Sequence, residues 1–311
     1  MKGKLLRGLV ALGILGILLS RMDLPVLLQR ASQIRWEGVP VALLIGVAAF
    51  TAVTYRWYLL LRAAASFPVH FRDLWTITFV GVFAGYFLPG GFSIDVVRGV
   101  YLYRHAPARS EALASLLVDR LLGLWVIVGL ATIGTLLTPD LRGWTRPLLL
   151  ITLITPLAAR LVLSDRVRGV LDRLLFHGRW GERWAQGYRA LQVYRDKPGA
   201  LLRAVIASAV FQILYVGIAH VALWMVGSHA LRFSRTLAYV TLLNAVTMIP
   251  ISVGGLGIRE GGFVALFAPY AGREGAFLAS LLYYVLSMLA SFPGGWLWFT
   301  GKDRLRMKRS S

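Results

Sequence analysis

Long apolar blocks run through this sequence and constrain its fold more than any other feature. The chain has 311 residues, of which 57% are hydrophobic and only 15% are charged. Soluble domains carry about 25% charged residues, and a soluble fold of this size has no interior large enough to hide such blocks. We therefore expect an all-α, polytopic membrane helix bundle, because helices satisfy their own backbone hydrogen bonds in lipid.

Eight apolar segments can be marked, and their ends are approximate. They are 5–20, 39–61, 74–97, 111–137, 147–163, 204–226, 236–262 and 276–300. The third and the seventh differ from the others because proline and glycine interrupt them. The interrupting residues, which we expect to act as hinges, are Pro89, Gly90, Gly91, Pro250, Gly254, Gly255 and Gly257.

The distribution of the 34 lysines and arginines predicts the topology. If all eight segments cross the membrane, the basic residues divide almost evenly between the two sides. If 74–97 and 236–262 enter and return on the same side, most basic residues gather on one side, as the positive-inside rule requires. We therefore expect about six full crossings and two re-entrant segments in a cell membrane. Both termini and the basic loop 164–203 would be cytoplasmic.

The two broken segments resemble each other. The same interval separates Pro89 from Arg98 and Pro250 from Arg259, and each interval contains a Gly-Gly pair. In the expected topology they enter from opposite sides, which makes the segments an inverted repeat. One membrane domain, 1–311, would then contain two repeat-like halves at about 39–137 and 200–300. The alternative is coincidence, since glycine and proline are common in membrane helices.

Broken segments at membrane depth also predict a cavity. Non-helical backbone survives there only where protein or water covers it. Matched breaks in two halves are the best pointer in a sequence to a transporter's substrate site. We therefore expect a central polar cavity lined by the two broken segments.

Several charged residues fall at membrane depth, where a charge costs several kcal/mol and needs a role or a partner. We expect an electrostatic site for an anionic head group, in which arginines would bind phosphate bidentately. The candidate residues for binding substrate are Asp95, Arg98, Arg120, Arg259 and Glu260. The alternative is that they form structural ion pairs between helices, and for Asp119 and Arg120 the two interpretations are equal. Arg56, beside Trp57, is interpreted as an interfacial anchor.

Spacing adds detail to these pairs. Asp95 and Arg98 share a face if the chain after Gly91 is helical. Asp119 and Arg120 are adjacent and point about 100° apart, so each should pair with a segment other than its own.

Composition excludes other classes of function. There is no cysteine, and the five histidines have no spacing typical of metal ligands, so we expect neither a metal nor a cofactor. The formal net charge of +20 could suggest nucleic acid, but the basic residues lie between apolar blocks, so anionic lipid is the expected counter-charge. The loop 164–203 forms either an interfacial helix on lipid or a solvated hairpin.

Three stretches carry a family resemblance. They are Phe87–Arg98, Leu117–Gly123 and Asn244–Glu260. In this order and spacing the chain resembles the flippase-like family of the lysylphosphatidylglycerol synthase transmembrane region. The resemblance implies movement of a phospholipid or a polyprenyl-linked lipid between leaflets, and it adds Asn244 to the candidate site. Where the family often has Gly-Gly-Asp, Phe92-Ser93-Ile94 precede Asp95. We expect no soluble synthase domain, because the chain ends soon after its last apolar segment.

Three functions remain open. The first is a lipid flippase or transporter; the sequence has no Walker A motif, so ion or proton coupling, or none, would drive it. The second is a non-catalytic scaffold subunit that binds a lipid-modifying enzyme. The third is a membrane-embedded lipid transferase, although no DxD or HxxxxD motif is present in the loops. We expect that the chain is not an enzyme.

Overall fold

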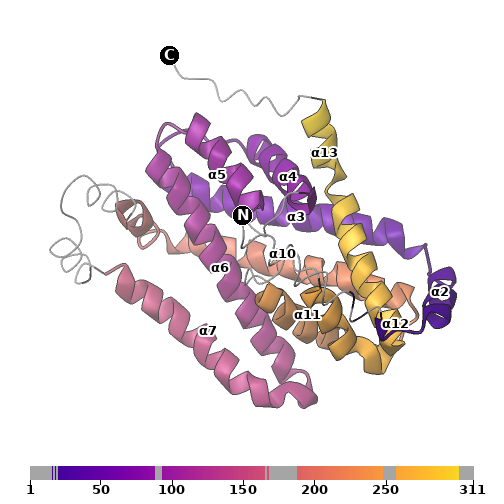
Figure 1. The fold of residues 1–311 in the computed structure, drawn as a ribbon. Coiled ribbons are helices and arrows are strands. Elements are labelled where there is room, and N and C mark those ends of the chain that lie inside the picture. Colours follow the sequence, from indigo (N-terminus) through magenta and orange to yellow (C-terminus); the bar gives the residue numbers. More distant parts are fainter. Residues whose placement is uncertain are drawn as a thin grey trace.

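The computed structural model is built from helices packed side by side (Figure 1). It describes residues 16, 18, 20–87, 93–164, 167, 188–247 and 257–300. The α-helices are α2 (Leu24–Ser32), α3 (Gly38–Ala64), α4 (Phe71–Phe87), α5 (Ser93–His105), α6 (Arg109–Leu136), α7 (Arg142–Val162), α10 (Pro198–Met225), α11 (Phe233–Thr247), α12 (Ile258–Ala290) and α13 (Phe292–Phe299), with a 3-10 turn η1 (Pro139–Leu141) before α7. Every regular element within those residues is helical, so the all-α prediction is confirmed.

Four helical spans are long and apolar enough to cross a membrane. They are α3, α6, α10, and η1 with α7, which together run from Pro139 to Val162. Helices α12 and α13 form a further candidate if they count as one bent span, with an angle of 42° between them. The protein is therefore a multi-pass membrane protein. The expected first crossing, 5–20, lies largely outside the described residues.

The two broken segments become short helices. Helix α4 has 17 residues and α11 has 15, which is below the roughly 20 residues that a perpendicular crossing requires. Each is followed by a gap in the described residues, after which α5 and α12 begin. The predicted hinges Pro89, Gly90, Gly91, Pro250, Gly254 and Gly255 lie outside the described residues. Gly257 is described, and its φ of 82° suits the turn that precedes α12.

Some boundaries differ from the sequence prediction. The last two segments, 236–262 and 276–300, share the single element α12, which is interrupted only where Gly272 adopts φ 73° and ψ 165°. The apolar pattern divides this helix in two, because the charged residues Arg273 and Glu274 interrupt the hydrophobic run although the helix continues through them. Helix α10 begins at Pro198, inside the predicted loop 164–203, since proline is favoured in the first turn of a helix.

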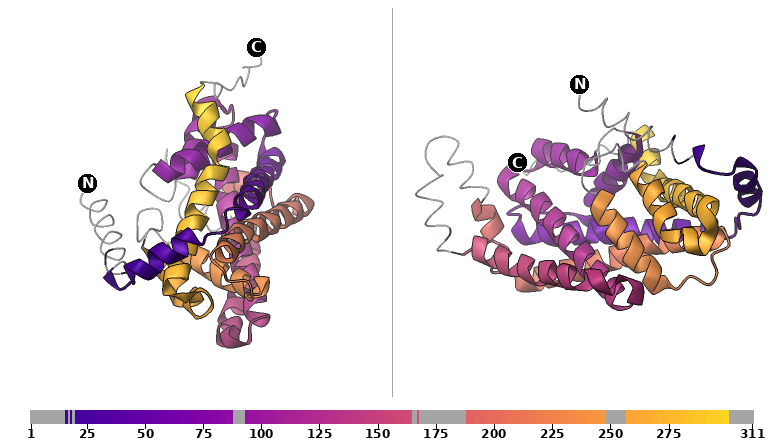
Figure 2. Two further views of the ribbon diagram at one scale, coloured as in Figure 1. Left: turned by 90° about the vertical axis from the view of Figure 1, so that its right-hand side faces the viewer. Right: turned by 60° about the horizontal axis from the view of Figure 1, so that its bottom comes forward.

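The centre of the bundle is the pair α3 and α10, which lie side by side (Figure 2). Aromatic rings join neighbouring helices to this pair: Phe50 of α3 contacts Phe79 of α4, with ring centroids 5.9 Å apart. Tyr215 of α10 contacts Tyr283 of α12 at 5.3 Å. Helix α7 lies along α6 at the edge of the bundle, and Leu157 on it is 68% exposed.

Two glycines bring backbones into direct contact. A Cβ atom built on Gly294 of α13 would lie 2.1 Å from the Phe79 carbonyl oxygen of α4. A Cβ atom built on Gly134 of α6 would lie 2.6 Å from the Cα atom of Ala238 on α11. Each short helix before a break, α4 or α11, thus packs against a helix of the other predicted half.

Candidate functional site: buried arginine clusters

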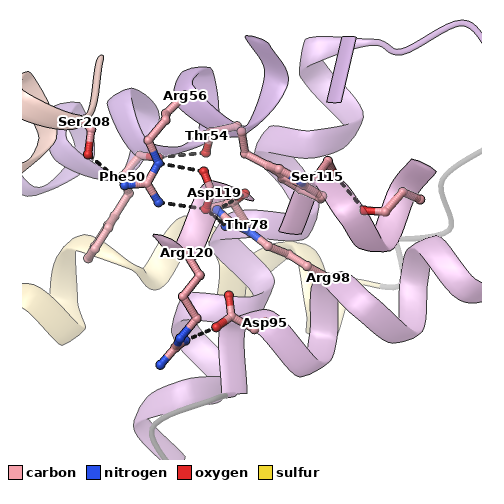
Figure 3. Close-up of polar contacts among 12 residues, drawn as sticks. Phe50, Thr54, Arg56, Thr78, Asp95, Arg98, Ser115, Asp119, Arg120 and Ser208 are labelled. Carbon is pink, nitrogen blue, oxygen red and sulfur yellow. Dashed lines mark hydrogen bonds and ion pairs between the residues drawn. The ribbon is translucent and has the colours of Figure 1, made fainter. Parts of the chain in front are cut away.

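Asp119 lies at the centre of a buried ionic cluster formed by three helices (Figure 3). The Arg56 guanidinium of α3 donates from Nε to Asp119 Oδ1 at 2.6 Å and from Nη2 to Oδ2 at 2.7 Å. Arg98 of α5 donates from Nη1 to the same Oδ2 at 3.3 Å. One carboxylate of α6 therefore binds two guanidinium groups, one tightly and one weakly.

Polar groups from two further helices complete the cluster. Arg56 Nη1 donates to Ser208 Oγ of α10 at 3.0 Å, and Arg98 Nη2 donates to Thr78 Oγ1 of α4 at 3.0 Å. The Arg98 guanidinium carbon lies 4.5 Å from the ring centroid of Trp57, which gives a cation–π contact. Arg98 Nε is buried and has no hydrogen-bond partner. All three guanidinium nitrogens of Arg56 thus donate hydrogen bonds, whereas Nε of Arg98 does not.

The local sequence makes room for this arrangement. Gly123 lies one turn after Asp119 on α6, and a Cβ atom there would be 2.8 Å from Arg56 Nη1. A larger residue at position 123 would push the guanidinium away from its place beside the carboxylate. The side chains of Arg56, Arg98 and Asp119 are 7%, 1% and 4% exposed, so water hardly screens their charges.

A second ion pair lies beside the first cluster. Arg120 of α6 donates from Nη1 to Asp95 Oδ2 of α5 (Figure 3). The side chains of Arg120 and Asp95 are 27% and 26% exposed, so this pair is the more open part of the site. Asp119 and Arg120 therefore each pair with residues outside α6, as their adjacency predicts, although both contact α5, through Arg98 and Asp95.

Arg259 and Glu260 form a separate cluster at the start of α12. Glu260 is fully buried; its Oε1 accepts from Arg259 Nε at 3.1 Å, and its Oε2 accepts from the Gly257 backbone N–H at 2.6 Å. The guanidinium of Arg259 lies 4.4 Å from the ring centroid of Tyr284. Glu260 thus caps its own helix and neutralises the adjacent arginine.

Tyrosines connect this second cluster to α4. The rings of Tyr86 and Tyr284 meet edge to face with centroids 5.1 Å apart, and Tyr284 Oη donates to the Tyr86 carbonyl oxygen at 3.4 Å. Tyr86 lies at the end of α4, just before the first break. Among the described contacts, none joins the Arg98 and Arg259 side chains directly.

The structure groups the predicted residues unevenly. Asp95, Arg98 and Arg120 come together around α6, and Arg259 with Glu260 lies in the second cluster. Asn244 is half-buried on α11, and its carbonyl oxygen accepts from Thr247 Oγ1 at 3.0 Å. In the described part of the chain, no contact joins the Asn244 side chain to either cluster.

The interpretation of Arg56 as an interfacial anchor is wrong. Arg56 is 6% exposed and makes the shortest contacts to Asp119. A charge inside the apolar segment 39–61 needs a partner, and that signal alone could have identified it. Ser208 and Thr78 carry no such signal, because a hydroxyl in a membrane helix can bond to its own backbone instead.

The clusters can bind anions but are not typical metal sites. Guanidinium groups present paired N–H donors that match the oxygens of phosphate and carboxylate. Within the described ranges, no group of three or more histidine or acidic side chains could hold a metal ion.

Comparison with known proteins gives one family. The chain matches the family described as "Lysylphosphatidylglycerol synthase TM region" over residues 4–294. No curated protein matches the chain.

Proposed function

Since the chain belongs to the family of the lysylphosphatidylglycerol synthase transmembrane region, which implies a lipid-related membrane role, we propose that it is a lipid flippase or transporter. Its cargo would be an anionic phospholipid or a polyprenyl-linked lipid moved between the leaflets of a cell membrane. The observation that carries this proposal is the buried cluster of Arg56, Arg98 and Asp119. Charges at this depth are costly and mark transport pathways in membrane proteins.

An inverted repeat is part of the proposal, and two features support it. Helix α4 packs on Gly294 of the second half, and α11 packs on Gly134 of the first half, so the two contacts are reciprocal. Arg98 and Arg259, which follow Pro89 and Pro250 at the same interval, each lie against an aromatic ring, that of Trp57 and that of Tyr284. Packing of each broken segment against a helix of the other half is expected if two re-entrant segments meet at the membrane centre.

The proposed topology has about six crossings and two re-entrant segments, with both termini and the basic loop cytoplasmic. The shortness of α4 and α11 supports re-entry, because neither is long enough for a perpendicular crossing. The C-terminal end of the basic loop is attached to α3: Tyr194 Oη donates to the Leu60 carbonyl oxygen at 2.9 Å, and Lys197 Nζ donates to that of Ala63. The central cavity between the broken segments is part of this proposal.

We also propose that the chain is not an enzyme. The loops contain no DxD or HxxxxD motif that would supply a base or a metal site for a lipid transferase. A role as a scaffold subunit is the second candidate, and one observation favours it. Arg56, Arg98, Arg120 and Arg259 each contact a protein carboxylate, which structural ion pairs would also do.

A leaflet-accessibility assay in proteoliposomes tests the proposal. Fluorescent phospholipids and polyprenyl phosphates are added in separate preparations, and the rate at which an external quencher bleaches inner-leaflet label is measured. We expect faster exchange for at least one lipid, lost in Arg98→Ala and Arg259→Ala at unchanged expression. Normal transport in both variants would overturn the site assignment. No acceleration for any lipid, with and without an ion gradient, would favour the scaffold subunit and a search for a partner enzyme.

A further inference from the structure

Helix α2 carries more apolar surface than the bundle covers. Leu27 on this helix, with Met22 before it and Ile34 after it, packs against the main hydrophobic core. Leu24 and Leu28 also lie on α2, yet they are 61% and 63% exposed. A helix of nine residues is too short to be stable alone in water, where about 12–15 residues are needed. One apolar side of this short helix is therefore left uncovered by the described part of the chain.

The side chains of α2 divide into three sectors around the helix axis. Successive residues point about 100° apart, so Leu24 and Leu28 lie on one line along the helix, roughly a quarter turn away from Leu27. Gln29 is exposed and lies about half a turn from Leu27. Helix α2 thus has one side on the bundle, an apolar side next to it and a polar side that faces away, which is the pattern of a helix lying at a membrane surface.

Helix α2 also lies at the end of a candidate membrane crossing. Helix α3 has 27 residues and is therefore about 40 Å long, which matches the hydrocarbon core together with its head-group layers. Figure 1 shows α2 beside the start of α3 and turned across its axis. A helix in that place runs along the membrane surface at the depth of the head groups. Tyr194 and Lys197 attach the basic loop to the other end of α3, so α2 belongs to the opposite surface.

Exposed apolar side chains continue from the crossing toward α2. Val41 and Leu44, near the start of α3, are 50% and 73% exposed, as expected of residues that face lipid. Trp36 lies between α2 and α3 and is 63% exposed. Tryptophan is enriched where membrane and water meet. The apolar side of α2 therefore follows directly, in the sequence, on a surface that suits lipid.

Contacts at both ends of α2 fix its orientation. Before the helix, the Asp23 backbone N–H donates to Glu274 Oε1 of α12 at 3.4 Å. After it, the Arg35 backbone N–H donates to the Met225 carbonyl oxygen of α10 at 3.1 Å. The Arg35 guanidinium carbon also lies 5.4 Å from the ring centroid of Trp224. These contacts set the rotation of α2 and with it the direction of its apolar side.

On this basis we propose that α2 is an interfacial helix that binds the membrane surface. It lies in the head-group layer, with Leu24 and Leu28 in contact with acyl chains and Gln29 in water. Arg21 and Arg30 are exposed there and lie at the level of the lipid phosphates. The partner is the bilayer surface, whichever lipid forms it. The inference requires only that α3 crosses the membrane, so it does not depend on the proposed transport.

Single-cysteine variants test the proposal, because the chain has no cysteine of its own. Leu28→Cys and Gln29→Cys are each labelled with a nitroxide in the full-length protein, which is reconstituted in vesicles of phosphatidylcholine and phosphatidylglycerol. Electron paramagnetic resonance measures how often the label collides with oxygen, which concentrates in lipid, and with a water-soluble nickel chelate. We expect a several-fold higher oxygen-to-nickel ratio for Leu28→Cys than for Gln29→Cys. Leu44→Cys on α3 is the reference for a position that faces lipid.

Three results would each overturn the proposal. Equally low oxygen-to-nickel ratios at the two positions would place the whole of α2 in water. Protection of Leu28→Cys from both reagents would mean that protein covers this side. Broadening of its spectrum that disappears on dilution with unlabelled protein would identify a second copy of the chain as the cover. If Leu28→Cys does not fold, Leu24→Cys repeats the measurement one turn away on the same apolar side.

Discussion

Arg56 and Asp119 form a two-pronged ion pair between α3 and α6, with N–O distances of 2.6 and 2.7 Å. The two residues are far apart in sequence, and both are almost completely buried. The pair links two of the candidate membrane spans and is also part of the candidate site, so we expect it to stabilise the packing of the bundle.

Breaking this pair should destabilise the fold. Arg56→Gln leaves the Asp119 charge with only the 3.3 Å contact from Arg98. Removing one partner of a buried pair costs about 3–5 kcal/mol. The measurement is thermal unfolding in detergent. Arg235→Gln, which breaks a largely exposed pair with Asp140, should cost about 1 kcal/mol or less. A loss for Arg56→Gln no larger than for this control would contradict the prediction.

Gly294 and Gly134 should tolerate no side chain. In Gly294→Ala the new Cβ would lie 2.1 Å from the Phe79 carbonyl oxygen, so α13 and α4 must separate. We expect a destabilisation of about 1–3 kcal/mol, the usual cost of overpacking. The comparison is Gly143→Ala on α7, where a Cβ atom has nothing within 4 Å.

Gly143→Ala should be neutral or should stabilise by about 0.5–1 kcal/mol, since alanine favours a helix over glycine. The readout for both glycine variants is the midpoint of thermal unfolding in the same detergent. Similar midpoints for Gly294→Ala and Gly143→Ala would mean that α4 and α13 do not pack as closely as described.

Several buried polar atoms have no hydrogen-bond partner, among them Gln212 Oε1 on α10 and Ser280 Oγ on α12. An unsatisfied buried polar atom costs about 1–3 kcal/mol, so Ser280→Ala should be neutral or stabilising. Ser208→Ala is the contrast, because Ser208 accepts from Arg56 at 3.0 Å.

Ser208→Ala should destabilise by about 1–3 kcal/mol, because it deprives a charged donor of its acceptor. Unfolding of the two serine variants in parallel checks the prediction. A clear loss of stability in Ser280→Ala would reveal that this hydroxyl has a partner, such as a bound water.

The contribution of Tyr194 to stability should be constant at neutral pH and should be lost only at high pH. Burial, and then the charge of Asp119, raises the pKa of Tyr194, whose hydroxyl donates to Leu60 at 2.9 Å. Because the folded pKa exceeds the unfolded value of about 10, the contribution is complete below pH 10 and is lost above it. Tyr194→Phe should lose about 1 kcal/mol at neutral pH and should weaken the alkaline decline in stability. Unfolding of the two proteins across this range is the measurement, and identical alkaline profiles would contradict it.

The sequence by itself determined the class of the protein, the approximate positions of its helices and the two segments interrupted by proline and glycine. Apolar blocks are local signals, and a helix in lipid needs no distant partner for its backbone hydrogen bonds. Local geometry also predicted that Asp119 and Arg120 each pair with a residue of another segment, since adjacent residues point about 100° apart.

Only the tertiary structure decided which charges meet. A helix such as α3 is apolar on almost all sides, because lipid and protein neighbours accept the same residues, so its sequence does not reveal which face is buried. For that reason Arg56 was assigned to the interface although it binds Asp119. The pairing of Arg98 with Asp119, and the packing of α4 on Gly294, depend on contacts between distant helices that no local pattern encodes.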